Sequence, residues 1–188
     1  MTGSAILPAV VANAAAAAKA WLRAADGADP SDRATIATLA DSAIVLAEAW
    51  CGRVFIARAV EDVVAAATGW QPLPMVPVSA IDRVQALASD GVSAALAAGD
   101  FAIDIDAGGV GWVRATRPFG QARLLVGYRA GNAASWADLP TPVAQGIAMM
   151  VAHLFDHREG DRAPPAAVAA LWRPWRRTRL AAVAGRPA

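Results

Sequence analysis

The sequence contains few of the residues from which covalent and metal sites are built. Cys51 is the only cysteine, and there are two histidines among 188 residues. A lone cysteine excludes an intrachain disulfide, and no CxxC motif or cluster of histidine and cysteine has the spacing of zinc ligands. The core therefore has to rest on hydrophobic burial alone.

A long run of strongly hydrophobic residues is also missing. The most apolar stretch, residues 5–22, consists largely of alanine, follows no basic segment and is interrupted by Lys19. A membrane span or a secretory signal would need a different composition and different flanks. We expect an amphipathic helix here, in a protein that is made in the cytosol and has no membrane partner.

The charges are divided unevenly along the chain. The first 170 residues hold 12 basic residues and all 16 acidic ones, whereas the remaining residues hold five arginines and no acidic residue. Such a division is typical of a body with an interaction tail. The sequence therefore predicts a single domain over residues 1–170 and a C-terminal partner-binding arm over residues 171–188.

Apolar residues recur at helical spacing in three segments of the chain. This periodicity predicts helices over residues 8–25, 31–51 and 140–158. Gly52 follows the second segment as a stop signal, and Pro140 suits the start of the third. A shorter helix is expected in the sequence PPAAVAALW.

Residues 53–128 have a different pattern, with short alternating or β-branched runs separated by Gly, Pro and Asp. This pattern predicts a small antiparallel β region. The fold class predicted from the order of the elements is α+β. In detail, we expect a mainly α-helical bundle with an inserted small antiparallel β region and a C-terminal helical arm.

The segment HLFDHREGD is the most enzyme-like part of the sequence. His153 and His157 are four residues apart on a predicted helix, as helix-borne metal ligands are. A zinc protease needs glutamate directly after the first histidine, and Leu154 occupies that position. We interpret the segment as the solvated end of a helix, where cationic groups are favoured by the helix dipole. A metal-dependent enzyme that uses the pair is the rival interpretation.

Two further segments could suggest ligand binding. DFAIDIDAGG offers Asp100, Asp104 and Asp106, but it lacks the terminal glutamate of a calcium loop. GGVGW, residues 108–112, lacks the spacing of a nucleotide-binding loop. We interpret the first as a half-buried strand and the second as a hairpin turn. No catalytic, cofactor-binding or metal site is expected, and the protein is interpreted as not an enzyme.

The segment LWRPWRRTRL, residues 171–180, holds two tryptophans and four arginines without an acidic residue. Two indoles can bury a large apolar area, and guanidinium groups are costly to desolvate in a core. The segment is therefore predicted to bind a partner. The candidate partner-binding residues are Leu171, Trp172, Arg173, Pro174, Trp175, Arg176, Arg177 and Arg179.

The chain resembles the head-tail adaptor family of long-tailed phages and gene transfer agents, also called connector or head-completion proteins. The C-terminal motifs that carry the resemblance are Tyr128, Ala130 and Gly131; Leu139 and Pro140; Phe155; Arg158 and Glu159; and Val168, Leu171, Pro174 and Arg176. The N-terminal matches are Lys19, Leu22, Arg23, Gly52 and Arg53. Trp172 and Trp175 depart from the family pattern, which has an aliphatic residue and a tyrosine there.

The resemblance implies a structural virion protein without cofactors, which is synthesised in the bacterial cytoplasm and located at the head-tail junction of a virion or phage-like particle. It implies a ring, commonly of twelve copies, that joins the portal protein of the head to a stopper or terminator protein of the tail. Double-stranded DNA would pass through the ring without sequence-specific binding. The C-terminal segment would dock on the portal.

Two other interpretations remain beside this one. The tryptophans and arginines of the tail would also suit a DNA-binding accessory protein, although the acidic body argues against tight generic binding. Without the resemblance, the chain would be interpreted as an α+β domain with a basic tail.

Overall fold

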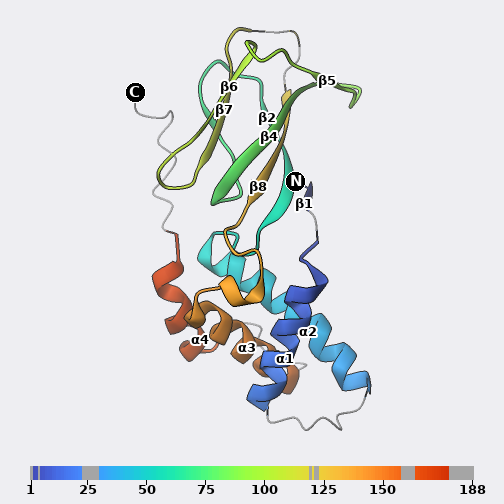
Figure 1. The fold of residues 1–188 in the computed structure, drawn as a ribbon, viewed down its shortest axis with the longest axis vertical. Coiled ribbons are helices and arrows are strands. Elements are labelled where there is room, and N and C mark those ends of the chain that lie inside the picture. Colours follow the sequence, from blue (N-terminus) through green and yellow to red (C-terminus); the bar gives the residue numbers. More distant parts are fainter. Residues whose placement is uncertain are drawn as a thin grey trace. The chain divides into compact units, whose positions relative to one another are not determined.

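The computed structural model describes residues 2–3, 5–22, 30–118, 120, 123–157 and 164–177. The chain forms two compact units (Figure 1). The helical unit comprises Ile6–Ile56 and Ala133–Arg177, and the β unit is built on Ala57–Asn132 with the first residues of the chain.

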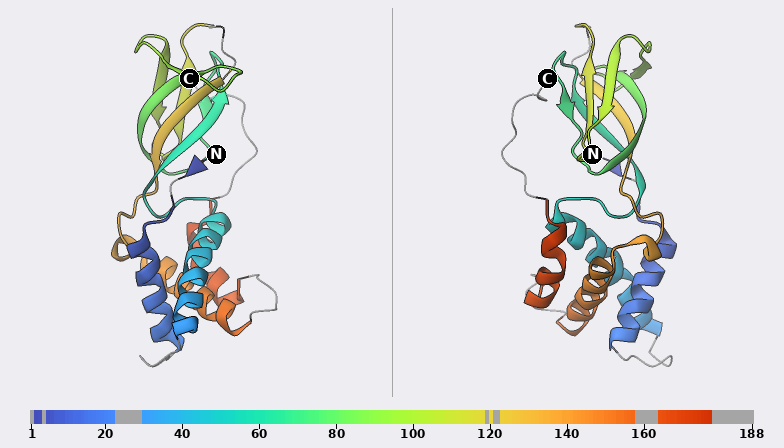
Figure 2. Two further views of the ribbon diagram at one scale, coloured as in Figure 1. Left: turned by 90° about the vertical axis from the view of Figure 1, so that its right-hand side faces the viewer. Right: turned by 60° about the vertical axis from the view of Figure 1, so that its left-hand side comes forward.

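The helical unit contains four α-helices and two short 3-10 helices among the described residues. These are α1 (Pro8–Leu22), α2 (Pro30–Cys51), η1 (Trp136–Asp138), α3 (Thr141–Asp156), α4 (Ala166–Trp172) and η2 (Arg173–Trp175). The first three α-helices lie within the ranges that helical spacing predicts, to within one residue at their starts. Helix α3 packs against α1, α2 and α4, as the two views of Figure 2 show.

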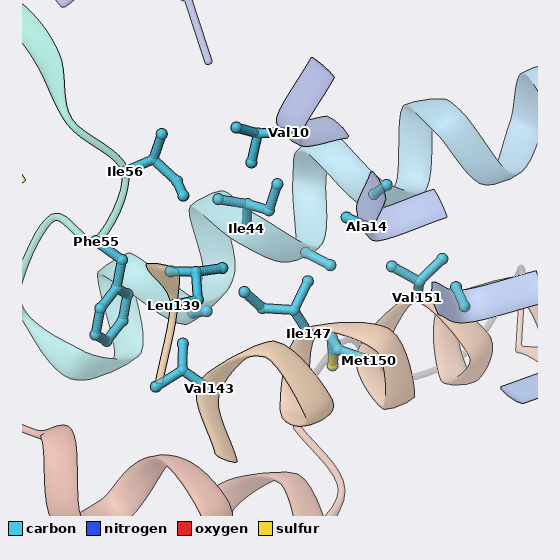
Figure 3. Packing of buried hydrophobic residues seen from close by; sticks show 14 of the residues in the cluster. Val10, Ala14, Ile44, Phe55, Ile56, Leu139, Val143, Ile147, Met150 and Val151 are labelled. Carbon is cyan, nitrogen blue, oxygen red and sulfur yellow. The ribbon is translucent and has the colours of Figure 1, made fainter. Parts of the chain in front are cut away.

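The core of the helical unit is made of aliphatic side chains from α2 and α3 and of small residues from α1. Ile44, Ile147 and Met150 are fully buried, and Phe55 and Leu139 close the cluster at one end (Figure 3). Ala14 and Ala18 contribute almost no side-chain volume, so α1 can approach the other helices closely. The alanine-rich stretch is thus one wall of the core.

Helix α2 is long and apolar enough over Ser31–Cys51 to cross a membrane by length and composition alone. Its apolar character is accounted for by packing, because Ile36, Ala40 and Ala47 are buried in the core of the helical unit. Its other face is exposed at Asp41 and Ser42.

The end of α2 is fixed by a buried carboxylate. Glu48 Oε1 accepts hydrogen bonds from the backbone N–H groups of Phe55, at 2.8 Å, and of Ile56, at 3.2 Å. Gly52 adopts a φ of 65°, in the left-handed region that ends many helices. The predicted stop at this glycine is confirmed.

The β unit contains two antiparallel sheets. The larger has the strand order β1-β2-β8-β4-β5 and the smaller β3-β7-β6. The strands are β1 (Thr2–Gly3), β2 (Arg58–Ala65), β3 (Gln71–Pro72), β4 (Val78–Leu87), β5 (Ser93–Ala95), β6 (Phe101–Ile105), β7 (Gly111–Ala115) and β8 (Arg123–Ala130). Strand β4 also contacts β6 and β7, which brings the two sheets together.

The prediction of a mainly α-helical bundle with a small β insert is wrong. The fold is a mixture of helices and sheets in which the β unit has its own core. Val60, Val84 and Val126 lie on one face of the three long strands and are buried, together with Leu73, Val113 and Leu124. The error arose because the runs look short along the chain, whereas pairing on both sides of β8 joins them into an extensive sheet.

A buried polar pair connects the strands of this core. The Tyr128 hydroxyl on β8 donates to Asp62 Oδ2 on β2 at 2.5 Å, and it accepts from the backbone N–H of Met75 at 3.2 Å. Burial, followed by the hydrogen bond to Asp62, raises the pKa of Tyr128 well above its ordinary value of 10.0. The phenol therefore stays protonated and keeps its donor role.

Candidate functional site

The predicted partner-binding segment begins inside the core of the helical unit. Trp172 is 0 % exposed, and its indole Nε1 lies 3.4 Å from the backbone oxygen of Val143, to which it donates. The ring lies against Gly146, where an added Cβ would stand 2.3 Å from Nε1. Only glycine leaves room for the indole at this position. Trp172 is therefore a core residue, and its side chain is not available to a partner.

The residues that follow Trp172 run along the end of α2. The backbone N–H of Arg177 donates to the oxygen of Cys51 at 2.7 Å, which satisfies one of the last carbonyls of that helix. The Cys51 thiol is 3.7 Å from the backbone oxygen of Trp172. Burial raises the pKa of Cys51 from 9.0 to about 11, so the thiol is protonated and unreactive near neutral pH.

This arrangement places cationic and aromatic side chains together at the C-terminal end of α2. The guanidinium of Arg176 lies 5.5 Å from the centre of the Trp50 ring, and that of Arg53 lies 5.8 Å from the Phe55 ring. Trp50 is 37 % exposed, Arg173 and Arg176 are exposed, and Trp175 is half-buried. We call this set the basic-aromatic surface: Trp50, Arg53, Arg173, Trp175, Arg176 and Arg177.

The helix itself favours positive charge at this surface. The C-terminal end of an α-helix carries a partial negative charge, and cations near it are stabilised by about 0.3–1 kcal/mol each. Glu48 is the acidic residue of the last turn of α2, and it is turned inward to the Phe55 and Ile56 amides. The basic-aromatic surface can therefore bind an anionic partner through its cations, and the exposed ring of Trp50 can contact an apolar part of that partner.

The remaining predicted residues are distributed around this surface. Leu171 packs against the core from a half-buried position, and Pro174 is exposed in η2. Arg179 lies outside the described residues. The predicted boundary between residues 170 and 171 falls inside α4, so the basic-aromatic surface belongs to the folded helical unit.

Sequence reasoning missed Trp50 and Arg53 as members of this surface. Trp50 continues the helical spacing of apolar residues in α2, so the local pattern gives no reason to expect it at a binding surface. The available signal was the sequence WCGR, in which an aromatic residue and a cation flank a helix stop.

The histidine pair lies at the end of α3, as the helix-end interpretation predicts. His157 follows the last residue of the helix, and its ring Nδ1 donates to the backbone oxygen of His153 at 3.0 Å. The two ring centres are 4.5 Å apart. Within the described ranges, no group of three or more His, Cys, Asp or Glu residues could hold a metal ion. Arg158, Glu159 and Asp161 lie outside those ranges.

The three aspartates of DFAIDIDAGG belong to a strand and its turn, as predicted. Asp106 Oδ1 accepts from the backbone N–H of Val110, and its Oδ2 accepts from the Trp112 indole, both at 2.9 Å. Asp100 forms an ion pair with Arg117 at 2.8 Å. Asp104 lies within β6. In the GGVGW segment, residues 108–110 belong to the turn between β6 and β7, as predicted, whereas Gly111 and Trp112 are the first residues of β7.

A pocket of about 440 Å³ lies between α2 and the end of α3. Four of its lining side chains are aliphatic, and one carboxylate and one imidazole are also among them. The lining residues are Thr35, Leu39, Asp41, Ser42, Val45, Leu46, Leu154 and His157. The hydroxyl of Ser42 and the imidazole of His157 are engaged with backbone oxygens of their own helices: Ser42 Oγ donates to Thr38 at 3.2 Å, and His157 Nδ1 donates to His153 at 3.0 Å.

The chain was compared with known proteins. No family model and no curated protein matches it. Among solved structures, a chain of the neck of an empty gene transfer agent particle, computed with C6 symmetry, matches with a TM-score of 0.74 and 24 % identity over 100 % of both chains. This chain has the fold of a gene transfer agent neck chain.

Two further structures agree. A chain of the virion of a native gene transfer agent particle matches with a TM-score of 0.72 and 24 % identity, over 98 % of this chain and 97 % of that chain. A chain from the neck of the native particle, computed with C12 symmetry, matches with a TM-score of 0.65 and 26 % identity over 100 % of both chains. The neck-chain fold confirms the resemblance to head-tail adaptors that the sequence motifs indicate.

Proposed function

We propose that the chain is a structural protein of the neck of a gene transfer agent or a related tailed-phage particle, at the head-tail junction. The observation that carries the proposal is the full coverage of both chains in the match to a particle neck. The helical unit and the β unit are both included in this match. The role is architectural, without a catalytic step.

The chain works as one of several identical copies in a ring. The matching neck structures were computed with C6 and C12 symmetry, and the family resemblance implies twelve copies. The ring joins the portal to a stopper or terminator protein of the tail, and its lumen lets double-stranded DNA pass. A lumen of this kind needs only weak contacts to DNA, because the DNA has to slide.

The basic-aromatic surface is the portal-docking site in this proposal. Arg173 and Arg176 are exposed cations that can make charge-assisted hydrogen bonds to carboxylates. Trp50 and Trp175 supply the partly exposed aromatic area that interface hot spots typically use. Leu171 and Trp172 contribute from inside the unit by holding this surface in place. The partner is therefore an acidic segment of the portal with an apolar centre.

Docking can be tested by binding of purified portal to the variant Trp50→Ala/Trp175→Ala. Loss of anchor aromatics typically costs about 2 kcal/mol or more each, so affinity should fall by well over tenfold. Arg173→Ala/Arg176→Ala should weaken binding less at physiological salt, because exposed cations mainly tune association rates. Arg33→Ala, an exposed arginine on the first turns of α2, is the matched control and should bind as the parent does.

The structural role itself is tested by deleting the gene for this chain in the producing cell. We expect heads that contain DNA but carry no tails, and restoration by the parent chain. Particles with attached tails in the deletion strain would contradict the proposal.

The cluster of guanidinium groups also gives a specific reason to test DNA binding as a second candidate. Each phosphate contact gives a slope of about −0.9 in a plot of log affinity against log salt. Base stacking would have to use Trp50 and Trp175, which are partly exposed, since Trp172 is buried. A steep salt dependence together with sub-micromolar DNA affinity would favour this second function over portal docking.

A further inference from the structure

The edges of the two sheets in the β unit are unequal. Three edge strands in the described part of the unit are very short: β1 has two residues, β5 has three, and β3 has two with Pro72 among them. Strand β6 has five residues and contains no proline, lysine or arginine. Natural sheets usually protect a long edge strand with proline, lysine or arginine, because the unpaired backbone groups of an unprotected edge attract another strand.

The outer backbone groups of β6 have no hydrogen-bond partner among the described residues. The N–H of Asp106 donates to the Val110 oxygen, and the Asp100 oxygen accepts from the Thr116 N–H, both at 3.0 Å. Residues of this parity therefore turn their backbone groups toward β7, and the alternate residues Phe101, Ile103 and Ile105 turn theirs away. Among the described residues, β6 pairs with β7 alone.

The side chains at this edge are apolar and exposed. Ile103 is 44 % exposed and Ile105 is 38 % exposed, although their strand neighbours Val113 and Gly111 are buried. The apolar face of the smaller sheet is therefore buried at β7 but exposed at β6. An added strand would gain hydrogen bonds and cover both isoleucines, as in strand addition to a sheet edge.

Strand β5 offers a complementary edge. The Val92 oxygen accepts from the Ala88 N–H, so Val92 and Ala94 face β4, while Ser93 and Ala95 turn their backbone groups outward. All three residues of β5 are exposed, none is charged, and Val92 beside it is 63 % exposed. Small side chains at this edge leave room for the isoleucines of another strand.

We propose that β6 of each copy of this chain pairs with β5 of the next copy. This inference rests on the proposed function, because a ring requires that each copy use two different surfaces. A contact between β6 of one copy and β5 of the next leaves one free β5 edge and one free β6 edge at the two ends of the growing assembly, so the addition can continue until the ring closes. A contact between two β6 strands would end at a dimer.

The test compares Ile103→Lys with Val63→Lys in particles from cells in which the variant replaces the parent. Both residues are 44 % exposed, but Val63 lies on β2, which pairs with β8 along its whole length and takes no part in the proposed contact. A lysine on an edge strand opposes strand addition. We expect at least a tenfold loss of Ile103→Lys from the necks and parental incorporation of Val63→Lys. Equal incorporation of the two folded variants, or equal loss, would overturn the proposal.

A second variant covers the case in which Ile103→Lys does not fold. Ala94→Cys/Ala102→Cys places thiols on β5 and β6, and buried Cys51 does not compete for a short thiol-specific cross-linker. Particles with this variant should give a ladder of multimers. Absence of cross-links in necks that contain the variant, or dimers from Ala102→Cys alone, would overturn the pairing. The proposed function fails separately, if the parent chain itself is missing from the necks.

Discussion

The helical unit and the β unit reach stability in different ways. The helical unit buries aliphatic and small side chains at regular spacing, and it closes with one large indole, Trp172, against Gly146. The β unit surrounds a buried polar pair, Tyr128 and Asp62, with β-branched residues from distant strands. The first unit should therefore be most sensitive to lost volume, and the second to lost hydrogen bonds.

The largest effect is expected at the closure of the helical unit. Trp172→Ala removes a fully buried ring and should lower the free energy of unfolding by about 3–5 kcal/mol. Trp175→Ala, three residues away and half-buried, is the matched control and should cost much less. Chemical denaturation followed by circular dichroism at 222 nm measures both. Equal effects of the two variants would show that Trp172 does not close the core.

The comparison also shows which features are readable from the sequence. Helices α1, α2 and α3 follow from local spacing, because residues three and four apart share a helix face. The β unit depends on partners far along the chain, such as Gly127, which faces Glu61 on one side and Arg83 on the other. The sequence shows alternation in each run but not which runs pair, so the extent of the sheets was underestimated.

The candidate site was predictable in composition but not in placement. The absence of acidic residues after residue 170 correctly singles out a cationic segment. Whether a tryptophan of that segment is buried depends on space that residues far along the chain leave for it. The missing side chain of Gly146 on α3 leaves this space for Trp172. Trp50 and Arg53 join the site only through the path of the backbone at Arg177, for which local sequence has no signal.

The second-largest loss of stability is expected in the β unit, at the buried pair of Tyr128 and Asp62. Tyr128→Phe removes the donor to Asp62 and the acceptor for the Met75 N–H, and leaves a buried carboxylate with fewer partners. The cost should be about 1–3 kcal/mol. Hydrogen exchange should show the loss in β2 and β8 but not in α3. Uniform loss of protection in both units would contradict separate stabilisation.

The stability of the two units should fall in different ranges of alkaline pH. The folded-state pKa values of Tyr128 and Cys51 are raised, so the unfolded chain loses these protons first and stability falls as pH rises. For Cys51 the loss begins near pH 9.0 and levels off near 11, with a total of about 2–3 kcal/mol. For Tyr128 it begins near pH 10.0 and continues upward.

This pH dependence is measured by denaturation of the parent, Cys51→Ala and Tyr128→Phe between pH 8 and about pH 11, a range set by the ordinary pKa values of the two groups. Cys51→Ala should remove the fall that begins near pH 9.0, and Tyr128→Phe the one that begins near 10.0. Parallel curves for all three proteins would contradict the assignment.

The smallest effect is expected at the ion pair on the outer face of the larger sheet. Arg83 crosses Gly127 to reach Glu61, and both side chains of the pair are well exposed. Arg83→Gln should therefore cost less than about 1 kcal/mol, and added salt should reduce the difference. A larger, salt-independent cost would mean that the stem of Arg83 contributes by packing over Gly127.

The central claim, that this chain is a structural component of a particle neck, is tested most directly by an averaged image of the neck of the native particle. The account predicts density that fits both units of this chain, repeated around the axis between the head and the tail. A neck in which every density is accounted for by other chains would contradict it.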